Sequence, residues 1–314
     1  METQPLGTSS LSISRLGYGC WRIAAPYEGA EPRPDRLAHG RDAVIAAYEA
    51  GYTLFDLADV YADGMSETLF GEVLREHPGM RESVVVASKC GVRKANQPHP
   101  GDPYRYDFSK DYIVRSCEDS LQRLGIERLD LYQLHRPDFL GDPSEIAAAF
   151  SQLHDQGKVV SFGISNCRPS LLTALQKHCP MPLVANQVEI SLIQLAAFQD
   201  GVLDQCLAER ITPMAWSPLG GGRLVQSGAI ELNDPHCAKK AKLRETMDHV
   251  ARELGCSRTV VSLAWLLRHP SGIVPLVGST NPENIRDAAR AVDLKMSREV
   301  WYRLFEAALG HRLP

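Results

Sequence analysis

The chain has 314 residues, of which 44% are hydrophobic and 23% charged, and its formal net charge is −4. This length and composition suit one large α/β unit, so we expect a single domain over residues 1–314. The small negative charge provides no basic surface, which argues against nucleic acid and membrane surfaces as partners. The N-terminal METQPLGTSS lacks the regions of a signal peptide, and the eight cysteines show no C-x-x-C spacing. We therefore expect a cytoplasmic protein with reduced thiols and no metal site.

Short apolar runs alternate with helical patterns along the chain. The segment TQPLGTSSLSIS comes first and predicts a small hairpin that turns at residues 7–10 and plugs the floor of a barrel. Eight strands follow, near Leu16–Cys20, Leu54–Asp56, Val84–Ser88, Leu131–His135, Phe162–Ser165, Val184–Gln187, Pro213–Ser217 and Ile273–Val277. Helices between strands imply parallel pairing through right-handed crossovers, and eight such units favour a closed (β/α)8 TIM barrel.

The helical segments show clear boundaries. One helix is expected to begin at Pro143, with Asp142 as its N-cap. Additional C-terminal helices are expected on either side of the last strand, over residues 241–255, 257–270 and 297–309. The stretch Gly91–Tyr106 is rich in proline and glycine and is expected to be a long loop without secondary structure.

Three titratable side chains stand at the carboxyl ends of consecutive predicted strands in the first half of the barrel. Asp56 ends the run LFD, Lys89 follows VVVAS, and His135 ends LDLYQLH, while Tyr61 lies in the loop after Asp56. In a (β/α)8 barrel, the carboxyl ends of the strands form the active face. Any one of these residues alone would suit a structural ion pair or a loop cap. Together they favour a coupled catalytic site.

A phenol beside a cation can deliver a proton. The pKa of a free tyrosine is near ~10, so Tyr61 needs a neighbouring cation, and Lys89 is expected to lower its pKa. Asp56 is expected to keep the buried Lys89 charged, and His135 could donate a hydrogen bond to a substrate oxygen. A lysine at a strand end also suits a Schiff-base lyase, so that alternative stays open.

Seven motifs resemble those of the aldo-keto reductase family, and in particular its bacterial YdhF-type oxidoreductase branch. They are FDLADVY, VVVASKCG, LDLYQLHRPD, FGISN, NQVEIS, MAWSPLGGG and VPLVGSTNPENI. The resemblance covers nearly the whole chain and implies an NAD(P)H-dependent oxidoreductase that reduces aldehydes or ketones to alcohols. It implies hydride transfer from nicotinamide to the carbonyl carbon, with Tyr61 as the acid and His135 orienting the carbonyl.

The resemblance also implies the residues that hold the cofactor. Ser165, Asn166 and Gln187 match groups that bind the nicotinamide carboxamide, and Trp216 matches the aromatic residue that stacks on the ring. The loop on the pyrophosphate side is matched by Ser217, Leu219, Gly221, Gly222 and Arg223. The adenosine end is expected at a helix capped by Asn281 and beginning at Pro282, with Gly278, Ser279, Thr280, Asn284 and Arg286 nearby.

Cofactor choice depends on the 2′-phosphate of NADPH. The family often carries an arginine at the position of Asn284, and Arg286 could compensate for its absence, so NADP(H) is favoured and NAD(H) is possible. The expected partner is a small carbonyl substrate, and the protein is expected to be a monomer. Some relatives of this fold are cofactor-bound regulatory modules with vestigial activity, which is a second alternative.

Overall fold

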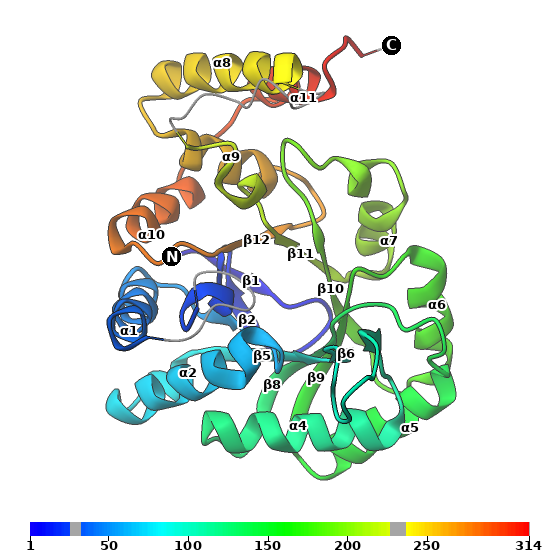
Figure 1. Ribbon diagram of the computed structural model, residues 1–314. Helices are drawn as coiled ribbons and strands as arrows, with labels where there is room; N and C mark the ends of the chain where they lie inside the picture. Colours follow the sequence, from blue (N-terminus) through cyan, green and yellow to red (C-terminus); the bar gives the residue numbers. More distant parts are fainter. Residues whose placement is uncertain (26–32, 227–236, 314) are drawn as a thin grey trace.

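The computed structural model describes residues 1–25, 33–226 and 237–313. Eight parallel strands close into a barrel that is surrounded by helices (Figure 1). In spatial order the strands are β3 (Gly17–Gly19), β4 (Leu54–Asp56), β5 (Val85–Cys90), β8 (Leu129–Leu134), β9 (Val159–Ser165), β10 (Leu183–Glu189), β11 (Thr212–Trp216) and β12 (Val274–Val277), which pairs with β3. The predicted (β/α)8 TIM barrel and its eight strands are confirmed.

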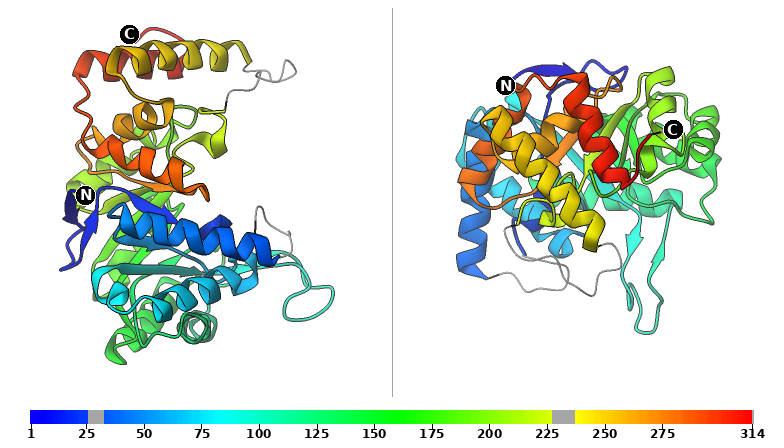
Figure 2. Two further views of the ribbon diagram at one scale, coloured as in Figure 1. Left: turned by 90° about the vertical axis from the view of Figure 1, so that its left-hand side faces the viewer. Right: turned by 90° about the horizontal axis from the view of Figure 1, so that it is seen from above.

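Helices follow the strands as expected. They are α1 (Pro34–Glu49), α2 (Met65–Glu76), α3 (Met80–Ser83), α4 (Lys110–Leu124), α5 (Pro143–Asp155), α6 (Pro169–His178), α7 (Val202–Glu209), α8 (Cys237–Leu254), α9 (Arg258–Leu267), α10 (Pro282–Ala289) and α11 (Arg298–Leu309). Short 3₁₀ helices are η1 (Cys20–Arg22), η2 (Tyr61–Gly64), η3 (Ala196–Phe198), η4 (Gly220–Gly222) and η5 (Arg290–Val292). The additional helices α8 and α11 pack side by side at one end of the molecule (Figure 2). No helix in the described ranges is long and apolar enough to cross a membrane.

A β-hairpin plugs the amino end of the barrel. Strands β1 (Thr3–Pro5) and β2 (Ser12–Ser14) pair antiparallel. Between them, the Gly7 N–H donates to Thr212 Oγ1 at the start of β11, at 2.7 Å. Leu6 and Ile13 are fully buried among the side chains that fill the barrel. The predicted floor hairpin is therefore confirmed.

The segment Gly91–Tyr106 is not a structureless loop, and that prediction is wrong. Strands β6 (Val92–Arg93) and β7 (Arg105–Tyr106) pair antiparallel, so the segment is a hairpin arm that projects from the barrel (Figure 2). Each strand has only two residues, which is too short to produce a period-two pattern in the sequence.

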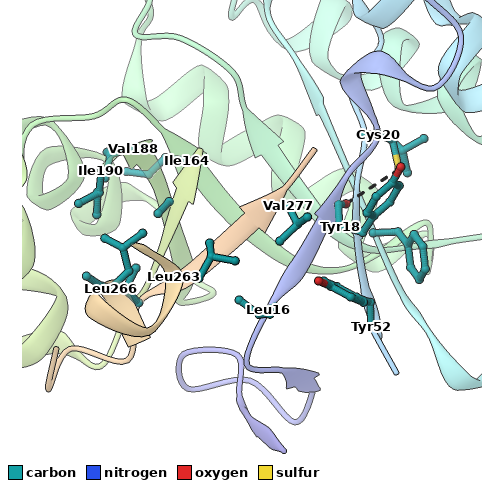
Figure 3. Packing of buried hydrophobic residues seen from close by; sticks show 14 of the residues in the cluster. Leu16, Tyr18, Cys20, Tyr52, Ile164, Val188, Ile190, Leu263, Leu266 and Val277 are labelled. Atoms are coloured by element: carbon teal, nitrogen blue, oxygen red, sulfur yellow. Dashed lines mark hydrogen bonds between the residues drawn. The ribbon is translucent and has the colours of Figure 1, made fainter. Parts of the chain in front are cut away.

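Successive side chains of each strand point alternately into the barrel and towards the helices, and this divides the hydrophobic core into two layers. Leu54 of β4 faces the barrel interior, and its neighbour Phe55 belongs to the layer between barrel and helices. Leu263 and Leu266 of α9 pack in this outer layer together with Val277 of β12 (Figure 3). The next interior position on β4 is Asp56, so the same alternation that builds the core directs a carboxylate into the barrel.

Gly71 provides a test of the helix packing around the barrel. It lies in α2, and a Cβ atom at this position would come within 2.3 Å of the Leu124 carbonyl oxygen at the end of α4. We expect Gly71→Ala to lower the free energy of unfolding by about 1–3 kcal/mol through overpacking, although alanine is the better helix former by about 1 kcal/mol. Urea denaturation measures this change. The exposed Gln122→Ala is the control and should stay within about 0.5 kcal/mol of the wild type; equal stability of Gly71→Ala would contradict the packing.

Candidate active site

Three neighbouring strands direct polar side chains into the carboxyl end of the barrel. On β4 Asp56 follows Leu54, on β5 Lys89 follows Ala87, and on β8 Gln133 follows Leu131, each two residues further along the inner face. The register pairs Asp56 with Ala87 and Lys89 with Gln133. Parallel strands with inward-facing polar ends thus bring these groups together above an apolar interior.

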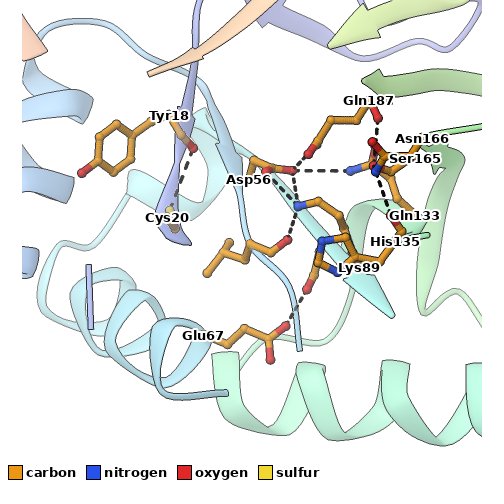
Figure 4. Close-up of polar contacts among 12 residues, drawn as sticks. Tyr18, Cys20, Asp56, Glu67, Lys89, Gln133, His135, Ser165, Asn166 and Gln187 are labelled. Atoms are coloured by element: carbon orange, nitrogen blue, oxygen red, sulfur yellow. Dashed lines mark hydrogen bonds and ion pairs between the residues drawn. The ribbon is translucent and has the colours of Figure 1, made fainter. Parts of the chain in front are cut away.

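A buried ion pair lies at the centre of this group. Lys89 Nζ is 2.8 Å from both carboxylate oxygens of Asp56 and 2.6 Å from the Leu57 carbonyl oxygen. Gln187 Nε2 also donates to Asp56 Oδ1 at 2.8 Å (Figure 4). Both charged side chains are buried, so the cost of removing them from water is offset by opposite charge and by these hydrogen bonds.

Lys89 keeps its charge despite burial. Burial alone lowers its pKa, but the charge and hydrogen bonds of Asp56 and the contact with Tyr61 outweigh that effect and leave the pKa above its ordinary value. Lys89 is therefore an ammonium at neutral pH. This is the role expected for Asp56 from the sequence.

The loop after β4 brings Tyr61 to this ammonium. The Asp59 N–H donates to the Lys89 carbonyl oxygen at 3.0 Å, which fastens the loop along β5. Lys89 Nζ lies 4.9 Å from the centroid of the Tyr61 ring. The ring of His135 meets the Tyr61 ring edge-on, with centroids 5.7 Å apart. The structure thus assembles all four residues of the predicted catalytic group.

The expected direction of the Tyr61 pKa shift is wrong. Burial raises the pKa of Tyr61, Lys89 lowers it and Asp56 raises it, with a net result above the ordinary value. The sequence indicated the neighbouring cation but not how strongly burial opposes the phenolate. Tyr61 therefore keeps its proton at neutral pH, which is the form that a proton donor needs.

His135 is held neutral one residue beyond β8. Burial lowers its pKa well below the ordinary value, and the positive charges of Lys89 and Arg136 lower it further. Its backbone N–H donates to the Cys90 carbonyl oxygen at 2.8 Å, and its Nδ1 is buried with no hydrogen-bond partner in the described part of the chain. A neutral imidazole can donate through one nitrogen and accept through the other, so His135 can bind a carbonyl oxygen.

A second polar layer behind the site was missed from the sequence. Glu67 of α2 is fully buried, accepts from Ser88 Oγ and pairs with Arg123 Nε at 2.7 Å. Asp59 Oδ2 accepts from Ser116 Oγ at 2.7 Å, and burial raises the Asp59 pKa to about 7. The available signal was Ser88, a polar residue at an outward position of an otherwise apolar strand, which requires a buried partner.

The residues expected at the nicotinamide form a connected group beside His135. Asn166 Nδ2 donates to the His135 carbonyl oxygen at 3.2 Å and to Ser165 Oγ at 2.8 Å. Trp216 Nε1 donates to Asn166 Oδ1 at 3.0 Å, and Ser165 Oγ donates to the Gln187 carbonyl oxygen at 2.8 Å. Strands β9, β10 and β11 thus place an amide and an aromatic ring next to the catalytic group.

The two segments expected at the phosphates have suitable backbone geometry. In η4 a Cβ added to Gly221 would have no atom within 4 Å, so the backbone there is open to close approach by a ligand. This loop also contains Ser217, Leu219, Gly222 and Arg223, of which Arg223 is exposed. The N–H groups of Gly220, Gly222 and Arg223 donate to carbonyl oxygens within the loop. The open backbone at Gly221 and the exposed Arg223 are therefore the features that suit a phosphate, and the residues present fit a nicotinamide dinucleotide.

The second segment expected at the cofactor phosphates is the start of α10. Asn281 Oδ1 accepts from the Glu283 N–H at 2.8 Å, which confirms the predicted N-cap. Ser279 and Thr280 precede the cap after the exposed Gly278, while Asn284 and Arg286 are exposed on the first turns of the helix. The Arg286 guanidinium lies 3.9 Å from Glu49 Oε2, a distance at which the ion pair is weak. No group of three metal-ligating side chains occurs in residues 1–25, 33–226 and 237–313.

Removing one charge of the buried pair tests its electrostatics. Asp56→Asn leaves the Lys89 ammonium buried without its counter-charge, so we expect the free energy of unfolding at neutral pH to fall by about 3–5 kcal/mol. The double variant Asp56→Asn/Lys89→Met removes both charges and should recover most of that loss. Urea denaturation of the three proteins measures both effects. A loss below about 1 kcal/mol in the single variant would show that the pair is effectively solvated.

Comparisons with known proteins agree with this geometry. A model of the aldo/keto reductase family matches residues 15–308. A 6-dehydroglucose reductase from Novosphingobium aromaticivorans is 38% identical over 315 residues, which cover 98% of this chain and 96% of that relative. Oxidoreductase YdhF from Escherichia coli is 42% identical over 267 residues, which cover 85% of this chain and 86% of YdhF, as the resemblance to that branch predicted.

A solved structure supports the same family assignment. The thermostable aldo-keto reductase Tm1743, in complex with the inhibitor epalrestat, superposes with a TM-score of 0.82 at 26% identity, over 98% of this chain and 100% of that chain. The family match and the curated relatives identify an oxidoreductase enzyme that acts on carbonyl groups. The chain belongs to the aldo/keto reductase family.

Proposed function

We propose that this protein reduces a small aldehyde or ketone with NADPH, with Tyr61 as the general acid. The observation that carries the proposal is the fully hydrogen-bonded Lys89–Asp56 pair, which lies against the Tyr61 ring and beside a neutral His135. This arrangement places a proton donor, a fixed positive charge and a hydrogen-bonding imidazole at one point of the barrel mouth.

Each side chain has a distinct task. The neutral His135 donates a hydrogen bond that orients the substrate carbonyl, and the Tyr61 hydroxyl gives its proton to the carbonyl oxygen as negative charge develops there. The Lys89 ammonium stabilises the phenolate left on Tyr61, because the two groups are close in a buried site. Asp56 keeps Lys89 charged and in place. A bound nicotinamide would supply the hydride for the carbonyl carbon.

The cofactor would lie across the barrel mouth from Asn166 to α10. Ser165, Asn166 and Gln187 would bind the carboxamide, and Trp216 would stack on the ring. The loop from Ser217 to Arg223 would hold the pyrophosphate against the open backbone at Gly221, with the Arg223 guanidinium nearby. Ser279, Thr280 and Arg286 would hold the 2′-phosphate of NADPH, with the helix N-terminus adding positive potential.

The alternatives are less well supported. A Schiff-base lyase needs a neutral lysine that can reach its substrate, but Lys89 is fully buried, ion-paired and has a raised pKa. A regulatory module with vestigial chemistry would not need Asp56, Tyr61, Lys89 and His135 to lie together at the barrel mouth. We also propose that residues 1–314 form one domain that acts as a monomer on a small-molecule substrate.

Removing the Tyr61 hydroxyl tests the proposal that Tyr61 is the general acid. Tyr61→Phe should lower kcat for reduction of an aromatic aldehyde by at least about a hundredfold, because general acid catalysis typically contributes that much. The affinity for NADPH should stay within about twofold of the wild type, since the ring is retained. Stopped-flow turnover and fluorescence titration measure the two quantities. Wild-type kcat in the variant would rule out Tyr61 as the proton donor.

Cofactor choice is tested at α10. Arg286 is the only full positive charge among the groups proposed at the 2′-phosphate, so Arg286→Ala should weaken NADPH binding about tenfold to a hundredfold. NADH lacks this phosphate and serves as the matched control, with little change expected. Asn284→Arg should tighten NADPH binding selectively. Quenching of tryptophan fluorescence measures each affinity, and equal NADPH and NADH affinities in all three proteins would instead favour NAD(H).

A further inference from the structure

Arg136 is a charged residue at the catalytic centre that the mechanism above leaves without a task. It directly follows His135 at the carboxyl end of β8 and is partly buried. Its guanidinium carbon lies 5.3 Å from the centroid of the Trp216 ring. The same Trp216 donates to Asn166, which in turn donates to the His135 carbonyl oxygen. Arg136 is therefore part of the group of side chains that surrounds the proposed reaction point.

The charge of Arg136 has no anionic partner in the part of the chain that the structure describes. Within residues 1–25, 33–226 and 237–313, no carboxylate lies within 4.0 Å of its guanidinium and no acceptor forms a hydrogen bond with it. The nearby Asp138 is already engaged, because its carboxylate accepts from the backbone N–H groups of Phe108 and Leu140, both at 2.9 Å. By contrast, Lys89 is neutralised by Asp56. Arg136 thus brings to the mouth of the site five N–H donors and a positive charge that no carboxylate of the described residues neutralises.

We propose that Arg136 binds a carboxylate on the substrate, so that the preferred substrates are aldehydes or ketones with a carboxylate a few bonds from the reacting carbonyl. This inference rests on the proposed function. A guanidinium matches a carboxylate with two parallel hydrogen bonds, and contact with Trp216 restricts its side chain before the substrate arrives. Because His135 and Arg136 are adjacent in the chain, a small molecule can span the carbonyl-binding imidazole and the guanidinium.

Matched substrates separate this role from general reductase activity. Wild-type protein with NADPH would be assayed on succinic semialdehyde and its methyl ester, and on para-carboxybenzaldehyde and its methyl ester. The two pairs place the carboxylate at different distances from the carbonyl, and each ester removes only the negative charge. We expect the wild type to favour the acid in at least one pair, through a lower KM.

Variants of Arg136 test the residue itself. Arg136→Met should reduce the ratio of kcat/KM for acid over ester by about tenfold to a hundredfold, mainly through KM. Arg136→Lys keeps the charge without the planar guanidinium. Its acid-over-ester ratio of kcat/KM should therefore lie between that of the wild type and that of Arg136→Met. Because lysine preserves charge and approximate length, it also keeps the test informative if methionine disturbs the fold.

Arg22 provides the matched control. It follows β3 at the same end of the barrel, and its guanidinium carbon lies 5.1 Å from the centroid of the Trp21 ring, so it shares the chemistry of Arg136 at a different tryptophan. Arg22→Met should leave the acid-to-ester ratio unchanged. An equal fall in Arg22→Met would assign the preference to the overall positive potential of the mouth and overturn the role of Arg136.

Two further results would also overturn the inference. If Arg136→Met lowers kcat/KM for acids and esters by the same factor, the residue only packs against Trp216. If the wild type reduces the esters and shows no preference for either acid, the proposed function stands and the carboxylate site does not. If the wild type reduces none of the four aldehydes with NADPH or NADH, both proposals fail together.

Discussion

The ion pair between Lys89 and Asp56 is the constraint on which the rest of the site depends. A charged pair inside a barrel is tolerated only when each charge is fully satisfied, and here Gln187, Gln133 and the Leu57 carbonyl oxygen complete the hydrogen bonding. The apolar interior and the floor hairpin exclude water from the other end of the barrel. The polar groups are therefore confined to the mouth, where a substrate can reach them.

Burial has opposite consequences for the neighbouring titratable groups. It favours the protonated phenol of Tyr61 and the uncharged imidazole of His135, whereas the carboxylate of Asp56 keeps the ammonium on Lys89. One environment thus produces a neutral donor, a neutral hydrogen-bonding group and a permanent cation. This division of protonation states is what a reaction requires when it creates negative charge on an oxygen.

The positions of Asp56 and Lys89 in the barrel could be predicted from the sequence, because side chains along a strand alternate strictly between its two faces. Once LFD and VVVASK are recognised as strands, Asp56 and Lys89 must face the interior at the same end. The alternation does not show which residues across the chain meet, so Glu67 with Ser88 and Asp59 with Ser116 were missed. The sign of the Tyr61 shift was also out of reach, because it is a difference between opposing effects that requires the actual burial.

The base of the hairpin arm has a consequence for how this enzyme can diversify. Directly after β5, the Gly91 carbonyl oxygen accepts from the Asp107 N–H at 3.0 Å, and Val92 pairs with Tyr106. The two ends of the arm are thus tied together within a few residues of Lys89. The free energy of closing such a loop grows only slowly with its length. Insertions and new sequences between the two tied ends can therefore accumulate over evolution, and reshape what the enzyme encounters at its entrance, while the lysine stays where it is.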